Sequence, residues 1–168
     1  MRNFVRVLGV DPGTYKLGVG VVYSDGPELI PAFYGVLSPK KRDSLPERLH
    51  YIHEHLLSVI NEWKPTEVAI EKPFAARNIR SAMAIGHAQA IAMVAAARHG
   101  LPVSYYAPRE VKQAITDYGG SSKEQVQEMV RVLLSLDVTP ESTDAADALA
   151  VAICHLNAGN LQHLVITE

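Results

Sequence analysis

Four acidic residues have the types and spacing expected of a metal site. Asp11 ends the first strand-like run of the sequence, and Glu71 ends a later one. If these two strands are parallel neighbours, both side chains emerge at the same carboxyl edge of the sheet, where open α/β sheets place their ligands. Asp144 and Asp147 are three residues apart, a spacing that puts both on one face of a helix. Four carboxylates are therefore expected to converge.

The expected convergence of these carboxylates defines the chemistry. Like charges at short range repel and raise one another's pKa values, so cations are needed between them. All-oxygen ligands suit hard ions such as Mg²⁺ or Mn²⁺. Two such ions about 3.5 to 4 Å apart stabilise both the attacking and the leaving oxygens of a phosphoryl displacement. The pattern predicts metal-dependent phosphodiester hydrolysis.

Each acidic residue also has a purely structural explanation. Asp11 precedes Pro12 and Gly13, so it can be only a turn former. Asp144 and Asp147 can simply favour the positive end of a helix dipole. The joint pattern, an acidic residue at the end of each of two strands plus a same-face pair on a later helix, favours the metal site. From spacing alone, both interpretations stay open.

Three strands are expected to open the chain. Residues 5–10 form a compact apolar run, and residues 12–14, Pro-Gly-Thr, supply the turn chemistry that stops a strand. Residues 17–23 and 29–37 are rich in Val, Ile, Phe and Tyr, and the Ser-Asp-Gly-Pro segment at 24–27 separates them. We therefore expect an antiparallel meander.

A helix and a fourth strand follow. In residues 45–63 apolar side chains recur at helical spacing with charged residues between them, and Pro65 follows the end. Residues 67–71 form a short apolar strand after this helix. The order predicts a crossover into a strand parallel to the first, and hence a mixed sheet.

The second half is expected to be mostly helical. Residues 78–99 are alanine-rich, with strong helix propensity, and Gly100 is placed to cap the helix. Residues 102–106 form a fifth predicted strand, and Pro108 opens a short helix. The final helices have their own start signals: a capping box of Ser121 with Glu124, and the N-cap Thr143 of a helix over residues 143–157.

Length and composition predict one domain without a linker. The chain has 168 residues, of which 48% are hydrophobic, enough to bury one sizeable core. The most lipid-like stretch, residues 88–97, is far below the roughly 20 residues that span a bilayer. The N-terminus lacks the apolar core of a signal peptide. We expect a cytoplasmic protein with no membrane contact, in which the single cysteine, Cys154, is a small packed residue.

The net charge of −2 argues against a generic DNA coat protein, because sequence-independent affinity for nucleic acid is largely phosphate neutralisation by Lys and Arg. If four acidic residues form a metal site, the rest of the chain carries +2, and the bound cations cancel the charge of the site. Six basic residues bracket the two stretches that hold the acidic residues, and we expect them to bind DNA. They are Lys72, Arg77, Arg80, Arg109, Lys112 and Lys123.

Phe74 lies among the first three of these cations. An exposed aromatic ring in such a setting is a stacking platform for an unpaired base. The alternative is a core residue that caps the alanine-rich helix. The histidines at 50, 53 and 55 are close in sequence but lack the spacing of a zinc site, so a solvated helix face is expected there and no role is assigned.

Four segments of the chain contain distinctive motifs: Gly9-Val10-Asp11-Pro12-Gly13-Thr14, Ala69-Ile70-Glu71-Lys72-Pro73-Phe74 with Arg77-Asn78, Val111-Lys112-Gln113, and Asp144-Ala145-Ala146-Asp147-Ala148-Leu149-Ala150. Together they resemble the signature blocks of the RuvC family of Holliday junction resolvases, in that family's order and approximate spacing. The resemblance covers nearly the whole chain. Two departures are visible: Lys72-Pro73 is more rigid than the usual run, and residues 159–168 have no recognisable counterpart.

The resemblance implies an α/β, RNase H-like fold with a five-stranded mixed sheet flanked by helices, with a nuclease domain at 1–158 and a C-terminal tail at 159–168. It implies a homodimeric endonuclease that resolves four-way DNA junctions by paired cuts on opposed strands, in homologous recombination and DNA repair. The metal ligands would be Asp11, Glu71, Asp144 and Asp147, with Mg²⁺, or Mn²⁺ in its place, and two ions per subunit.

The resemblance also implies contacts with DNA and with other proteins. Phe74 would stack on DNA near the junction, and Lys112 and Lys123 would contact phosphates near the scissile strand. The sequence contains no Walker-type phosphate loop, so branch migration must come from a separate motor, which the resemblance indicates is the RuvA and RuvB complex.

Two other classes of function fit parts of the sequence. The stretch from Asp11 to Thr14, followed by Lys16 and Gly18, resembles the phosphate-binding hairpin of actin-like and sugar-kinase ATPases. That class needs two such domains, and only one fits here. A non-catalytic junction-binding protein is disfavoured because all four carboxylates are present. The related YqgF-type nucleases share only the first block.

Overall fold

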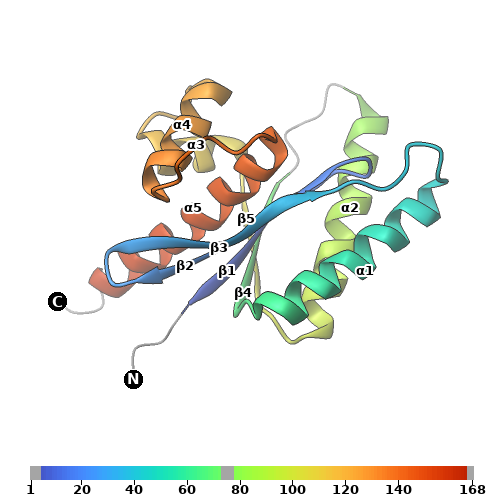
Figure 1. Ribbon diagram of the computed structural model, residues 1–168, viewed down its shortest axis with the longest axis horizontal. Coiled ribbons are helices and arrows are strands. Elements are labelled where there is room, and N and C mark those ends of the chain that lie inside the picture. The colour runs from blue at the N-terminus through green and yellow to red at the C-terminus, as the bar shows by residue number, and fades with distance from the viewer. Residues whose placement is uncertain (1–4, 73–77, 166–168) are drawn as a thin grey trace.

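The computed structural model describes residues 5–72 and 78–165, with side chains described as far as residue 159. Its centre is one five-stranded sheet in the order β3-β2-β1-β4-β5 (Figure 1). Strands β1, β2 and β3 pair antiparallel, whereas β4 is parallel to both β1 and β5. The predicted mixed sheet is confirmed. The strand bounds are Arg6–Asp11, Leu17–Asp25, Glu28–Leu37, Glu67–Glu71 and Val103–Tyr106 for β1 to β5.

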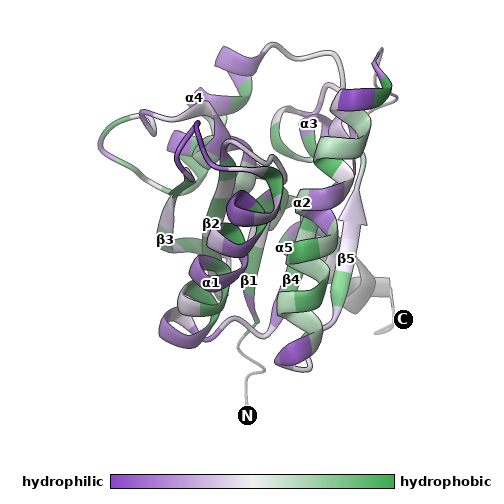
Figure 2. Ribbon diagram, turned by 90° about the vertical axis from the view of Figure 1, so that its right-hand side faces the viewer, coloured by the Kyte–Doolittle hydropathy of each residue, from purple (hydrophilic) through white to green (hydrophobic). Residues whose placement is uncertain are grey.

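Helices cover both faces of this sheet (Figure 1). Alternate residues of β1 point to opposite sides, so Leu8 joins the core under α1 and α2, whereas Val7 joins the core under the other three helices. Figure 2 shows α1 with both hydrophobic and hydrophilic segments, as expected of a helix with one buried face. The helix bounds are Leu45–Trp63, Ile79–Arg98, Pro108–Thr116, Lys123–Leu133 and Thr143–Val165 for α1 to α5.

Helix α1 has the bounds predicted from its apolar spacing. Its start is fixed by Ser44, whose backbone N–H and hydroxyl both donate to the Glu47 carboxylate at 2.7 Å. Its end is fixed by Lys64, which adopts the left-handed conformation. The buried face contributes Ile52, Leu56, Val59 and Ile60 to the core, each worth roughly 1.5 to 3 kcal/mol of burial.

Two predicted boundaries are wrong. The N-cap of α4 is Ser122, one residue later than expected: the Ser122 hydroxyl accepts from the N–H of Gln125, and the Gln125 side chain accepts from the N–H of Ser122. Ser121 is instead buried, and its hydroxyl donates to the carbonyl of Tyr118 at 2.8 Å. Helix α5 continues past residue 157 to Val165, because a single glycine at 159 costs only about 1 kcal/mol in a helix.

Helix α2 is apolar and packs one face against the core. Ala88, Ala92, Ala95 and Ala96 are buried against the sheet and α1. In the part of the chain that is described, α2 is also the one helix long and apolar enough to cross a membrane, judged by length and composition only. A helix packed in the core of a folded domain meets the same criterion, so this property is weak evidence for a membrane segment.

Candidate active site

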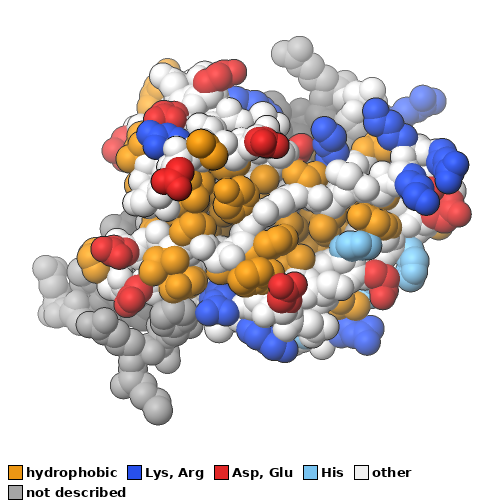
Figure 3. Space-filling view, viewed as in Figure 1, with side chains coloured by type: hydrophobic (Ala, Val, Ile, Leu, Met, Phe, Trp, Pro, Cys, Tyr) orange, Lys and Arg blue, Asp and Glu red, His pale blue; other side chains and the backbone are white. Residues whose placement is uncertain are grey.

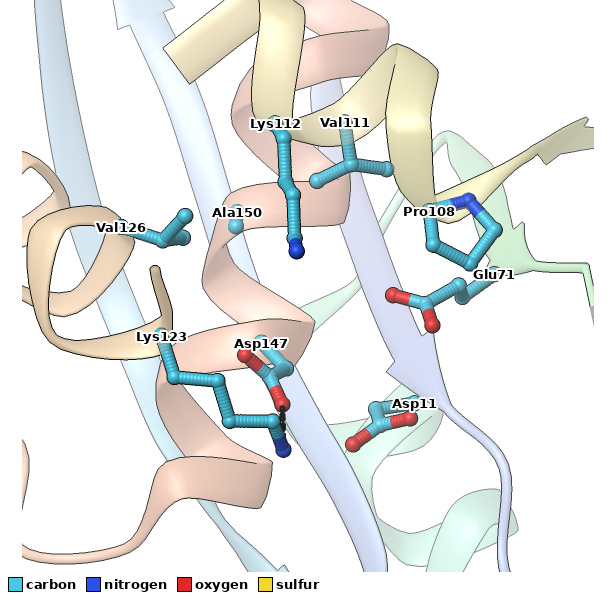
Figure 4. A pocket seen from close by; sticks show the side chains of 9 residues that line it. All are labelled: Asp11, Glu71, Pro108, Val111, Lys112, Lys123, Val126, Asp147 and Ala150. Carbon is cyan, nitrogen blue, oxygen red and sulfur yellow. Dashed lines mark ion pairs between the residues drawn. The ribbon is translucent and has the colours of Figure 1, made fainter. Parts of the chain in front are cut away.

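Three of the four predicted carboxylates line one pocket. Asp11 is the last residue of β1 and Glu71 the last residue of β4, and the parallel register that pairs Val10 with Ile70 brings these two ends together. Asp147 reaches the same pocket from α5, and Figure 4 shows the three side chains around one space. The pocket has a volume of about 240 Å³. The predicted meeting of two strand ends with a later helix is confirmed for these residues.

Two glycines allow α5 to lie directly on the sheet. A Cβ atom at Gly9 of β1 would collide with the carbonyl oxygen of Ala148, and one at Gly18 of β2 would collide with the carbonyl oxygen of Asp144. Glycine within a strand commonly marks such a close backbone approach. These positions set the distance between α5 and Asp11. Sequence reasoning missed their role, although glycines inside strands were the available signal.

Burial and mutual repulsion raise the pKa values of the pocket carboxyls. Burial is the largest cause for Asp11, whose pKa rises to about 8, with further increases from the charges of Glu71, Asp147 and Asp144. Burial and the charge of Asp147 raise the pKa of Glu71 to about 7. Burial also raises the pKa of Asp147. The site therefore disfavours its own negative charges unless positive charge is supplied.

Two predicted DNA-binding lysines supply part of that charge. Lys123, the first residue of α4, lies with its Nζ 3.5 Å from a carboxylate oxygen of Asp147 (Figure 4). Lys112 of α3 also lines the pocket, and its charge acts to lower the pKa values of Glu71 and Asp147. A phosphate that enters this pocket would meet both ammonium groups.

Asp144 lies beside the pocket and does not line it. Its carboxylate accepts a long hydrogen bond of 3.5 Å from the Ser142 hydroxyl, and its charge raises the pKa values of Asp11 and Asp147. Among the side chains of residues 5–72 and 78–159, no group of three or more His, Cys, Asp or Glu is arranged as a metal site. The donor set nevertheless fits a hard divalent cation, because it consists of carboxylate oxygens whose charges burial leaves poorly compensated.

The other predicted DNA-binding residues lie outside the pocket lining. Lys72 is exposed just after β4, where its N–H donates to the carbonyl of Tyr106 at 2.7 Å. Arg80 is exposed in the first turn of α2, and its N–H donates to the Asn78 side chain. Arg109 is exposed on α3. Phe74 and Arg77 lie outside the described residues.

Comparisons with known proteins point to one family. The profile of the family described as "Crossover junction endodeoxyribonuclease RuvC" matches residues 7–155. A protein of that name from Dehalococcoides mccartyi is 50% identical over 151 residues, which are 90% of each chain. Another from Magnetococcus marinus is 44% identical over 153 residues, 91% of this chain and 84% of its own.

Solved structures give the same result. Thermus thermophilus RuvC in complex with a Holliday junction substrate superposes with a TM-score of 0.89 at 35% identity, over 94% of this chain and 96% of that one. The yeast mitochondrial Holliday junction resolvase Ydc2 superposes with a TM-score of 0.66 at 12% identity, over 95% of this chain and 82% of that one, a likeness of fold alone.

Proposed function

This chain belongs to the RuvC family of crossover junction endodeoxyribonucleases, and we propose that Asp11, Glu71, Asp144 and Asp147 are its metal-binding carboxylates. Its fold is RNase H-like, and its activity is the metal-dependent resolution of four-way DNA junctions in recombination and repair. The observation that supports the ligand assignment is the single pocket in which the parallel ends of β1 and β4 meet α5.

The proposed metal is Mg²⁺, with Mn²⁺ as a substitute and two ions per subunit. Asp11 and Glu71 would hold the ions from the sheet, while Asp147 and the neighbouring Asp144 would hold them from α5. Bound ions of this type stabilise the attacking and leaving oxygens of a phosphodiester. The raised pKa values support this assignment, because divalent charge would favour the ionised carboxylates that burial opposes.

The residues around the carboxylates would position the DNA strand. Lys112 and Lys123 enter the pocket from two different helices, so they can contact the phosphates on either side of the scissile bond. Lys72, Arg80 and Arg109 would contact the backbone further from the cut. Phe74 and Arg77, in the segment between β4 and α2, would act on the bases and backbone near the crossover point.

We also propose a homodimer that forms through α2. Its exposed apolar residues include Ile79, Met83, Ala90, Met93 and Val94. At about 100° per residue these positions fall on one stripe, opposite the alanines that contact the core. A stripe of this kind rimmed by polar residues is typical of an association surface. Two subunits would supply two metal sites, which suits paired cuts on opposed strands.

The remaining proposals concern the cellular setting. A four-way junction is the substrate, and the RuvA and RuvB branch-migration complex is the proposed partner that moves the crossover to the cutting position. We place the protein in the cytoplasm, where it meets chromosomal DNA, with residues 1–158 as the nuclease domain and 159–168 as a tail. The family match gives no support to the ATPase alternative.

The activity and its metal dependence are tested together with an end-labelled synthetic four-way junction. With Mg²⁺ we expect symmetric nicks near the crossover on two opposed strands. The same protein with EDTA, and a linear duplex of one arm's sequence with Mg²⁺, serve as controls and are expected to give no such products. An intact junction after incubation with Mg²⁺ would contradict the proposed function.

A further inference from the structure

Three consecutive cations between β3 and α1 have no part in the site described above. Lys40, Lys41 and Arg42 are all exposed. Figure 1 shows this loop beside the turn that follows β1, toward the end of the sheet where β1 places its carboxylate. In the space-filling view, Lys and Arg side chains gather over the same end of the molecule (Figure 3).

The backbone of this basic turn, residues 40–42, is well anchored. The N–H of Asp43 donates to the carbonyl of Lys40 at 3.0 Å, which closes the turn. The carbonyl of Asp43 accepts from Nη1 of Arg48 at 2.8 Å. The next residue, Ser44, is the N-cap of α1. The three cations are therefore displayed from a fixed loop, which reduces the entropic cost of binding a ligand.

The Arg48 side chain also connects the basic turn to the turn that follows β1, the strand that ends at Asp11. The Arg48 guanidinium lies over the ring of Tyr15, 4.0 Å from its centroid. Tyr15 belongs to the turn that directly follows Asp11, and 53% of its surface is exposed. Because one face of the ring is stacked on Arg48, that face is closed to a nucleobase. This arrangement favours contact with a phosphate backbone over base stacking.

The basic turn keeps a net positive charge, because residues 40–43 sum to +2 when the adjacent Asp43 is included. Glu47, the nearest acidic residue on α1, directs its carboxylate to the N-cap, and these hydrogen bonds from Ser44 lower its pKa. Within the described part of the chain, no carboxylate pairs with Lys40, Lys41 or Arg42. A surface of this kind attracts a polyanion and releases counterions when it binds.

We propose that the basic turn binds the sugar–phosphate backbone of a duplex arm of the junction, beyond the strand that enters the metal pocket. This inference rests on the proposed function. Tyr15 and Arg48 hold the turn at a fixed position relative to Asp11, so binding of the arm helps to set which phosphate reaches the carboxylates. The turn thus extends the DNA-binding surface along the edge of the sheet.

The test uses the full-length protein and measures junction binding in EDTA as a function of salt concentration. The variant is the triple substitution Lys40→Ala, Lys41→Ala and Arg42→Ala. The control is Arg98→Ala, which removes an exposed cation at the C-terminal end of α2. Each cation that binds a phosphate contributes about 0.9 to the magnitude of the slope of log K against log salt. We expect the slope of the triple variant to be smaller by roughly two to three such increments per subunit, and its affinity near 0.1 M salt to be at least about tenfold weaker.

A salt slope equal to that of the wild type and the Arg98→Ala control would overturn the proposal. Junctions with progressively shorter arms locate the binding position of the turn. The affinity difference between wild type and triple variant should disappear once the bound part of the arm is removed. A difference that persists on the shortest arms would assign the turn to the crossover and contradict binding to an arm.

A second variant, Arg48→Lys, tests the anchor. It keeps the positive charge but removes the planar group that stacks on Tyr15 and donates to Asp43. We expect part of the decrease in slope seen in the triple variant, and an unchanged slope would contradict the anchoring role. Failure of the wild-type protein to bind or cut a junction would instead count against the proposed function, so the two failures are distinguishable.

Discussion

Asp11 and Glu71 end two neighbouring parallel strands, and the charge of Glu71 raises the pKa of Asp11. Neither residue is placed there for stability. Burial alone would favour their protonated forms; the charge of Asp147 adds to that preference for both residues, and the charge of Asp144 adds to it for Asp11. A site that is unfavourable for the protein by itself, and favourable once it binds cations, is typical of residues kept for function.

The pH dependence of stability follows from these shifts. For a carboxyl whose pKa is raised on folding, the stabilising contribution is present below its unfolded pKa and is lost as the pH rises through the folded pKa. For Asp11 the window runs from about 4 to about 8, and for Glu71 from about 4.5 to about 7. In EDTA, the protein should therefore lose stability as the pH rises across this range.

The variant Asp11→Asn should remove most of that pH dependence. We expect it to be more stable than wild type at pH 8.5 in EDTA, by roughly 1 to 3 kcal/mol, and nearly equal to it at pH 4, where Asp11 is largely protonated in the folded state. Calorimetry at the two pH values measures the difference. Destabilisation of the variant at pH 8.5 would show that the Asp11 charge is compensated within the protein.

The close approach of α5 to the sheet predicts a steric effect at Gly18. In Gly18→Ala the new methyl group meets the Asp144 backbone carbonyl, so α5 must move away from β2. We expect a loss of about 2 to 4 kcal/mol of stability together with slower cleavage, since Asp144 and Asp147 move with the helix. The matched control is Gly35→Ala in β3, where the nearest atom is 3.6 Å away and denaturation should shift little. Equal effects of the two substitutions in urea denaturation would refute the close approach.

The proposed stacking of Phe74 on DNA predicts that its loss affects cleavage more than stability. The variant Phe74→Ala should fold and bind a junction but cut it more slowly, because loss of base stacking removes about 1 to 3 kcal/mol from distortion of the strand. A core residue would instead cost about 3 to 5 kcal/mol of stability. Chemical denaturation of the variant, measured beside its cleavage rate, decides between these roles.

The α2 stripe predicts how the dimer can be disrupted. Met83 is 57% exposed within the stripe, so Met83→Lys should leave the fold intact but separate the subunits. Light scattering should report twice the 18.3 kDa chain mass for wild type and about the single mass for the variant, with paired nicking abolished. The control is Val132→Lys on α4, where the native side chain is 50% exposed on a different helix. A monomeric wild type at micromolar concentration would contradict the dimer.

Local patterns predicted most of the fold. The apolar spacing of residues 45–63 was sufficient for α1 because its caps, Ser44 and Lys64, agree with its buried stripe. The strand ends at Asp11 and Glu71 were predictable because apolar runs stop there. The capping box of α4 was predicted one residue too early. Ser121 and Ser122 each precede a Glu or Gln by three residues, and only the burial of Ser121 decides between them.

Contacts that depend on how helices pack could not be predicted from the sequence. The ion pair of Lys123 with Asp147 joins the first residue of α4 to the second turn of α5, and no sequence spacing encodes it. The position of Asp144 beside the pocket, and not in its lining, depends on how far α5 is rotated over β2. The stacking of Arg48 on Tyr15 likewise joins α1 to the turn after β1 across the fold.

The most direct test of the ligand assignment is the cleavage of a bound junction by Asp11→Asn and Asp147→Asn, with Asp137→Asn as an exposed control. Each substitution keeps the shape of the side chain and removes one charge. We expect single-turnover cleavage in Mg²⁺ to fall by about 100-fold or more in the first two variants, with junction affinity in EDTA not weakened. The control should cut at the wild-type rate. Cleavage at the wild-type rate by either Asp11→Asn or Asp147→Asn would contradict the assignment of these carboxylates as metal ligands.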